Sequence, residues 1–204
     1  MENFYLKDGL DSSKLSKTDL IAYLGPDCTL DVYIGQYRLA INVLIIQVEQ
    51  RKIGLLNAIS LPLLFMIRHV FELISKRFIF WFERRFDARL PELKLDINSH
   101  KISLLSEYQI TYYFEFMKHI PGKVEKGILR SYIQAVRDLS KILILVDNES
   151  YQLRYHINKN KMSCFDGGFQ INCKDLLENY YKYLELGYKI WGFTDYFPDP
   201  EYNY

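Results

Sequence analysis

Apolar residues recur at helical spacing along most of the chain and divide it into long segments. From Asp31 to Lys52 they return at steps of three and four residues, which predicts a long amphipathic helix. A second helix is predicted to run from a Ser60 cap, with Pro62 in its first turn, to about Glu83. This helix is apolar almost all round, so we expect it at the centre of the protein.

Two further helices are predicted before the pattern changes. Asn98 or Ser99 can cap a helix over residues 100–120, which Pro121-Gly122 then stops. The next helix carries a single apolar stripe over residues 124–146. Long helices joined in this way are typical of a bundle.

The C-terminal part of the chain begins with a different periodicity. Residues 151–157 alternate in the manner of a strand and turn residues follow, which predicts a small β-hairpin at about 150–172. Asn172 then caps a last helix with Asp175 in its first turn. The predicted fold class is mainly α, a bundle of four to five long helices with a small C-terminal β-hairpin. At least half of the residues should be helical, with strand confined mainly to the hairpin.

The length of the chain and its helix-breaking residues predict one domain with two flanking segments. A chain of 204 residues suits a single core. Residues 1–30 are polar, with a Gly25-Pro26 breaker, and are predicted to form an N-terminal arm. Residues 31–192 form the predicted helical domain, and residues 193–204 an acidic, aromatic tail.

Composition limits the classes of function. The net charge of +1 excludes a global basic field for nucleic acid, so RNA binding would have to be local. Between Lys76 and Lys101, seven basic residues oppose four acidic ones, which describes either a solvated surface or such a local patch. The 17 Tyr and 13 Phe favour packed cores and interfaces, and hence a partner surface.

The compartment is predicted from cysteines and apolar segments. Cys28, Cys164 and Cys173 are odd in number and lack the close pairs of structural zinc sites, which favours a reduced, cytoplasmic protein. The first residues lack the basic and apolar regions of a secretory signal. The apolar run over residues 61–82 contains five ionisable side chains, each costly in a bilayer, so we expect a core helix and no membrane contact.

A polar stripe crosses this apolar run. Arg68, Glu72 and Lys76 are four residues apart and His69 is three before Glu72, so all four share one side of a helix. In one interpretation Glu72 balances the two cations and His69 is a satisfied core histidine, which makes the stripe a structural network. In the other, the clustered ionisable groups form a functional site with tunable protonation states.

The run 61–76, LPLLFMIRHVFELISK, resembles the "P-x-L-F-x-x-R-H-x-x-E-L-x-x-K" helix of a group of HEPN-like prokaryotic proteins. Ser99–Leu105 is similar to the "H-D-L-x-x-L" segment of that group, and Leu153–Tyr155 to its "F-R-Y-P" element. Asp175–Leu177 resembles the Asp-led helix that follows. Lys101 stands where Asp is usual, and the residue after Tyr155 is His instead of Pro.

The resemblance implies a component of a prokaryotic antiviral defence or toxin–antitoxin system. Such a component would bind RNA, a nucleotide or a partner protein of the same operon, and would form a homodimer through its helices. HEPN ribonucleases cut RNA without metal through an Arg-x(4–6)-His motif, in which Arg stabilises the phosphorane charge and His handles protons. None of the four His residues here follows an Arg at that spacing, which favours binding over cutting.

Two alternatives stay open, a divergent metal-independent endoribonuclease and a non-catalytic structural subunit. No metal and no cofactor are predicted, because no phosphate-binding loop or zinc-protease motif occurs. The candidate catalytic residues are Arg68, His69 and His100, which could meet across two helices, and the candidate ligand-binding residues are Glu72, Lys76, Arg154 and Tyr155.

Overall fold

Five α-helices account for 84% of the residues that the structure, a computed structural model, describes. The described residues are 29–51, 54–86, 99–155, 163–165, 168 and 170–194. The helices are α1 (Leu30–Arg51), α2 (Gly54–Phe86), α3 (Ile102–His119), α4 (Lys123–Asp147) and α5 (Cys173–Thr194). This confirms the predicted mainly helical bundle. The predicted arm and tail lie outside the described residues, except for residues 29–30, of which Leu30 begins α1, and residues 193–194, which end α5.

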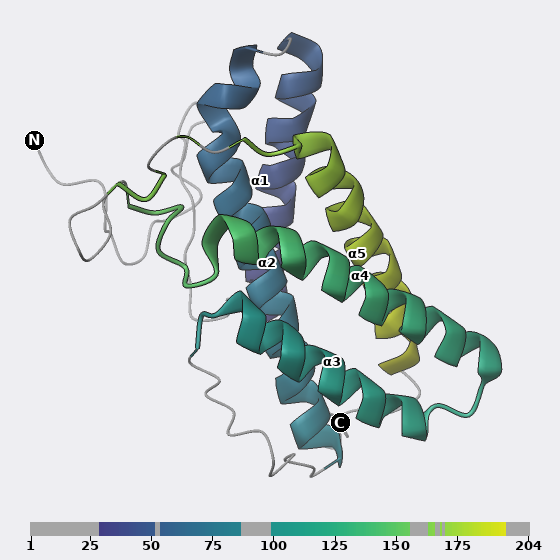
Figure 1. The fold of residues 1–204 in the computed structure, drawn as a ribbon. Helices are drawn as coiled ribbons and strands as arrows, with labels where there is room; N and C mark the ends of the chain where they lie inside the picture. Colours follow the sequence, from purple (N-terminus) through teal and green to yellow (C-terminus); the bar gives the residue numbers. More distant parts are fainter. Residues whose placement is uncertain are drawn as a thin grey trace, which may run out of the picture.

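Each helix packs mainly on the next one along the chain. α2 lies between α1 and α3, and α4 lies between α3 and α5. Figure 1 shows α1 and α2 as an antiparallel pair, with α3 and α4 crossing in front of α2 and α5 at the side of the bundle. At 33 residues α2 is about 50 Å long, so it reaches every other part of the bundle.

The central helix begins earlier than predicted. α2 starts at Gly54, so Pro62 lies inside the helix, and the Ser60 hydroxyl donates to the Asn57 carbonyl at 3.2 Å instead of capping. Apolar residues before Pro62 extend the helix towards the N-terminus, so this proline does not lie in the first turn, where prolines are common. Over Leu56–Phe86 this helix is long and apolar enough to cross a membrane, and 56% of its most apolar window is buried within the described part of the protein.

α1 is not the amphipathic helix that its spacing predicts. Ile34, Ile41 and Ile45 are buried against the core, as expected. Leu39 and Val43, however, are large apolar side chains on the exposed side. The periodicity identified one apolar face, and α1 has two.

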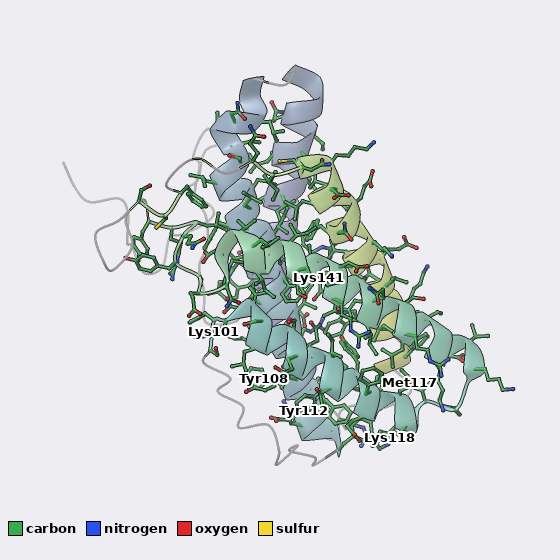
Figure 2. The ribbon with its side chains drawn as sticks, viewed as in Figure 1. Lys101, Tyr108, Tyr112, Met117, Lys118 and Lys141 are labelled. Atoms are coloured by element: carbon green, nitrogen blue, oxygen red, sulfur yellow. The ribbon has the colours of Figure 1, made fainter. Side chains whose placement is uncertain are left out.

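The cap of α3 comes from Asn148, the residue that follows α4. The helix begins after Lys101, and no side chain of that residue caps it. Instead, the Oδ1 atom of Asn148 accepts the Ser103 amide at 2.9 Å, and the Asn148 carbonyl accepts the Ile102 amide at 3.0 Å. The predicted Ser99 accepts only the Lys101 amide, at 3.2 Å, and Asn98 lies outside the described residues. Figure 2 marks this junction by Lys101 at the start of α3.

The C-terminal hairpin is not confirmed. The described residues contain no strand, and residues 151–155 form a turn in which the amides of Arg154 and Tyr155 donate to the Tyr151 carbonyl, each at 3.1 Å. Residues 156–162 lie outside the described part of the chain. The cap of the last helix is confirmed, since the Oδ1 atom of Asn172 accepts the Asp175 amide at 3.2 Å.

Aromatic rings from four helices form the middle of the core. Phe78 of α2 stacks on Tyr113 of α3 with centroids 3.8 Å apart, and Tyr113 meets Tyr132 of α4 edge-on at 5.0 Å. Tyr132 stacks on Tyr183 of α5 at 5.3 Å, and Gln109 donates to both of these tyrosine hydroxyls at 3.4 Å. Burial raises the pKa of Tyr183 to about 12, so this hydroxyl stays neutral.

We expect Phe78→Ala to lower the free energy of unfolding by about 3–5 kcal/mol, because it removes a fully buried ring from this stack. Phe80→Ala, two residues away on α2 but 46% exposed, is the matched control and should change it by under about 1 kcal/mol. Urea unfolding followed by circular dichroism measures both values. Similar losses for the two variants would contradict this assignment of the core.

Candidate functional site

Arg68 is completely buried and uses its whole guanidinium inside the protein. Its Nε donates to the Asp147 carbonyl at 2.8 Å, and its Nη1 donates to Glu72 Oε2 at 3.1 Å. Its Nη2 donates to the carbonyl of His100. This one side chain of α2 thus holds the end of α4 and the residues before α3.

Asp147 extends the network into the turn after α4. Its carboxylate is fully buried, with Oδ2 3.8 Å from the Arg68 Nε. Oδ1 accepts the Tyr151 amide at 2.8 Å and Oδ2 accepts the Leu153 amide at 3.2 Å. Amides held in this way cannot join a strand ladder, which is the physical reason that this described segment is a turn.

Glu72 connects the buried network to the surface. Its Oε1 lies 2.9 Å from Lys76 Nζ and 2.7 Å from His100 Nδ1. Glu72 is 2% exposed, whereas the His100 side chain is 59% exposed. Burial by itself would raise the pKa of Glu72, but its contacts with Lys76 and His100 outweigh burial and lower it. The carboxylate is therefore charged and balanced.

His69 stands apart from this network. Its ring stacks on Phe65 at a centroid distance of 5.7 Å and meets Tyr37 of α1 edge-on at 4.7 Å. Burial is the main cause that lowers the pKa of His69, and Arg68 and Lys76 lower it further, against the opposite effect of Glu72. The trio of Arg68, His69 and His100 is therefore not assembled around one open space.

The other two candidate ligand residues lie at the turn. Arg154 is exposed, its Nε donates to the Ser150 carbonyl at 2.7 Å, and its guanidinium carbon lies 5.5 Å from the Tyr155 ring centre. Tyr155 is half exposed and packs on Tyr151 with ring centres 4.7 Å apart. Both residues are accessible, and the turn that carries them is anchored by Asp147.

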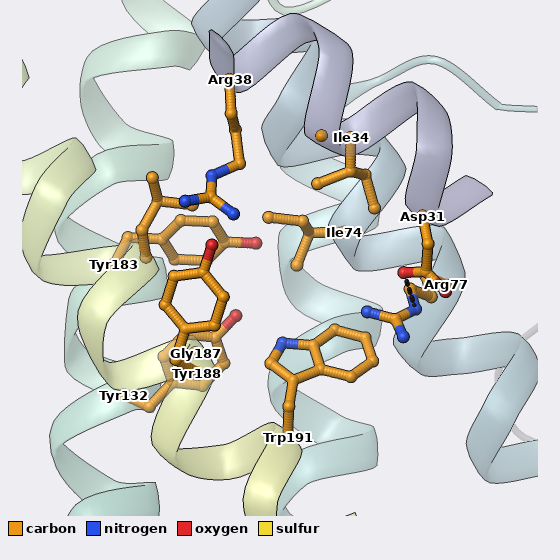
Figure 3. A pocket seen from close by; sticks show the side chains of 12 residues that line it. Asp31, Ile34, Arg38, Ile74, Arg77, Tyr132, Tyr183, Gly187, Tyr188 and Trp191 are labelled. Carbon is orange, nitrogen blue, oxygen red and sulfur yellow. Dashed lines mark ion pairs between the residues drawn. The ribbon is translucent and has the colours of Figure 1, made fainter. Parts of the chain in front are cut away.

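A pocket that sequence reasoning missed opens between α1, α2 and α5, with a volume of about 210 Å³. Arg77 pairs with Asp31 at 2.7 Å, and its guanidinium carbon lies 3.5 Å from the ring centre of Trp191. Arg38 lies 4.6 Å from the ring centre of Tyr188. Figure 3 shows both guanidiniums directed into the space between the helices.

The Nε of Arg38 is buried and has no hydrogen-bond partner among the described residues. Two guanidiniums face one carboxylate in this pocket, so its lining carries an excess positive charge. One feature of the sequence could have drawn attention to this pocket, because Arg38 is the only charged residue between Asp31 and Glu49. Only the fold, however, places it beside Arg77 and the rings of α5.

Comparisons with known proteins add no relative. No family model, no curated protein and no solved structure matches this chain. Within the described residues, no group of three or more His, Cys, Asp or Glu is placed to hold a metal ion. The site is therefore interpreted from its own geometry.

We expect Glu72→Ala to lower the free energy of unfolding by about 3–5 kcal/mol, because it leaves Arg68 and Lys76 without their shared carboxylate. His100→Ala removes only an exposed partner of Glu72 and should cost about 1 kcal/mol or less. Chemical denaturation of the two variants measures the difference. A Glu72→Ala protein as stable as the wild type would show that the network does not hold the fold.

A second expectation concerns pH. The unfolded chain binds a proton on His69 near its ordinary pKa of 6.5, whereas the folded protein does so only at lower pH. Stability contributed by neutral His69 is thus present above about pH 6.5 and is lost as the pH falls below it. We expect the wild-type Tm to fall between about pH 7.5 and about pH 5.5, and the fall to be smaller in His69→Phe, which keeps the aromatic packing. An equal fall in both proteins would contradict this role.

Proposed function

We propose that this chain is a HEPN-like component of a prokaryotic antiviral defence or toxin–antitoxin system that binds a nucleotide and does not cut RNA. The resemblance in residues 61–76, 99–105 and 153–155 motivates the class. These segments are far apart in the sequence, and the bonds of Arg68 and Asp147 bring them together. Their convergence supports a shared structural signature.

The state of Arg68 argues against cutting. A catalytic arginine must offer donors to the developing phosphorane charge. All three nitrogens of Arg68 donate to protein acceptors, and the side chain has no exposed surface. His69 packs between two aromatic rings. Two of the three candidate catalytic residues therefore serve the fold.

The pocket between α1, α2 and α5 carries the binding proposal. Guanidiniums held on aromatic rings suit a ligand with an anionic group and a planar body, and the two arginines face a single carboxylate, that of Asp31. Drug-sized ligands occupy pockets of about 300–1,000 Å³. A volume of about 210 Å³ therefore suits a mononucleotide with part of it outside, and is too small for an enclosed dinucleotide.

One observation favours the alternative, a divergent metal-independent endoribonuclease. His100 is more than half exposed, and its Nδ1 lies 2.7 Å from a buried carboxylate that orients the ring. A histidine so placed can act as a general base or acid. In this alternative Lys76, 2.9 Å from the same carboxylate, would supply the positive charge that Arg68 cannot offer.

The binding proposal is tested by titrating the protein with a mononucleotide such as GMP or AMP, with the uncharged nucleoside as the control ligand. We expect a Kd between about 10 µM and about 1 mM for the nucleotide and at least about tenfold weaker binding to Arg38→Ala. The ion pair in this pocket joins Asp31 to Arg77, so it should survive the substitution of Arg38. Arg130→Ala, an exposed arginine on α4 away from the pocket, is the matched control and should bind normally.

Equal nucleotide affinity in Arg38→Ala and Arg130→Ala would remove the pocket from the proposal. Cleavage of an RNA oligonucleotide by the wild type without metal, lost in a folded His100→Ala variant, would favour the ribonuclease instead. Absence of binding and cleavage alike would leave the structural subunit as the interpretation of the chain.

A further inference from the structure

Within the described part of the chain, Asp31 is the one carboxylate that lines the pocket between α1, α2 and α5. It lies in the first turn of α1, with its Oδ1 2.7 Å from the Nε of Arg77. Figure 3 draws this ion pair as a dashed line, with Trp191 next to the guanidinium of Arg77. In the free protein, Asp31 therefore occupies one of the two guanidiniums that an anionic ligand of this pocket would contact.

Arg77 does not depend on Asp31 alone for its position. Its guanidinium carbon lies 3.5 Å from the ring centre of Trp191, a cation–π contact that holds the group from α5. The side chain of Asp31 is 55% exposed and that of Arg77 is 33% exposed, so water screens the ion pair between them. The pair can therefore open while Arg77 keeps its place in the pocket.

We propose that Asp31 competes with the ligand for Arg77, an inference that deepens the proposed nucleotide site and rests on it. On binding, the anionic group of the ligand takes the place of the carboxylate, and Asp31 turns to solvent. In the first turn of α1 the released carboxylate still interacts favourably with the helix dipole. Asp31 thus lowers the affinity of the pocket for anions, whereas it leaves the binding of an uncharged molecule unchanged.

This exchange determines which class of anion the pocket selects. The guanidiniums of Arg38 and Arg77 and the carboxylate of Asp31 leave the lining with a single positive charge. A singly charged ligand that displaces Asp31 leaves that balance as it was, so it gains little. A phosphate monoester carries nearly two negative charges near neutral pH and balances both guanidiniums. The ligand class is therefore a nucleotide with a terminal phosphate, and carboxylates and phosphodiesters bind more weakly.

The test is calorimetric titration of the full chain with AMP, with the 5′-methyl ester of AMP, which is a phosphodiester, and with adenosine. We expect the wild type to bind AMP at least about tenfold more tightly than the methyl ester. Asp31→Asn should bind both anions at least about fivefold more tightly than the wild type does, and adenosine equally. Asp175→Asn removes an exposed carboxylate from the first turn of α5, outside the pocket, and is the matched control that should bind like the wild type.

Two further variants separate competition from a structural role. Asp31→Glu keeps the carboxylate and should bind AMP within about threefold of the wild type. In an Arg77→Gln background, Asp31→Asn should change the affinity by less than about twofold, because the guanidinium for which it competes is gone. A substitution that only loosened α1 would lower the Tm and weaken binding. Competition instead requires tighter binding at a nearly unchanged Tm, which circular dichroism measures.

An affinity for AMP that is unchanged or weaker in Asp31→Asn would overturn the competition. A wild type that binds the methyl ester as tightly as AMP would overturn the ligand class. The proposed nucleotide site survives either result if AMP binding still depends on Arg38. Failure of the nucleotide site itself looks different, because neither the wild type nor Asp31→Asn would then bind AMP, and that result overturns both proposals.

Discussion

The buried guanidinium of Arg68 is the interaction on which the rest of the structure depends. It donates to Asp147, to Glu72 and to the backbone of His100, so one side chain of α2 joins the start of α3 to the end of α4. A buried arginine is costly unless each donor finds an acceptor, and here two carboxylates also balance its charge. The cap of α3 by Asn148 and the turn held by Asp147 both follow from this junction.

This junction also changes the interpretation of the polar stripe in α2. A run of Arg, His, Glu and Lys in an apolar helix suggests an active site, because clustered ionisable groups are where pKa values shift. In the structure Arg68 and Glu72 are buried, and His69 packs against aromatic rings of α1 and α2. Of these residues and His100, only His100 has a largely exposed side chain. The need to neutralise buried charge explains this run of residues, and that need arises in a structural network as well as in an active site.

α1 contributes to both the core and the pocket. One side of this helix packs on α2, its edge contributes Arg38 to the pocket, and aliphatic side chains such as Leu39 and Val43 are exposed on its outer side. An isolated helix with two apolar faces would expose one of them.

Local patterns in the chain were enough to predict the helical class, the approximate extent of α1, α4 and α5, the Asn172 cap and the central position of α2. These features follow from the spacing of apolar residues and from capping residues within one segment, and neither depends on how that segment packs in the fold. The polar stripe of Arg68, His69, Glu72 and Lys76, with His100 expected to join it, was also predicted, but His69 packs against aromatic rings and lies apart from the network. The packing of the helices was needed to show that Asn148 caps α3, that residues 151–155 form a turn, and that Arg38 and Arg77 line one pocket. The cap and the pocket join groups from segments distant in the sequence, and the turn depends on Asp147, which Arg68 of α2 contacts. No periodicity within one segment records which distant donor or acceptor will lie beside it.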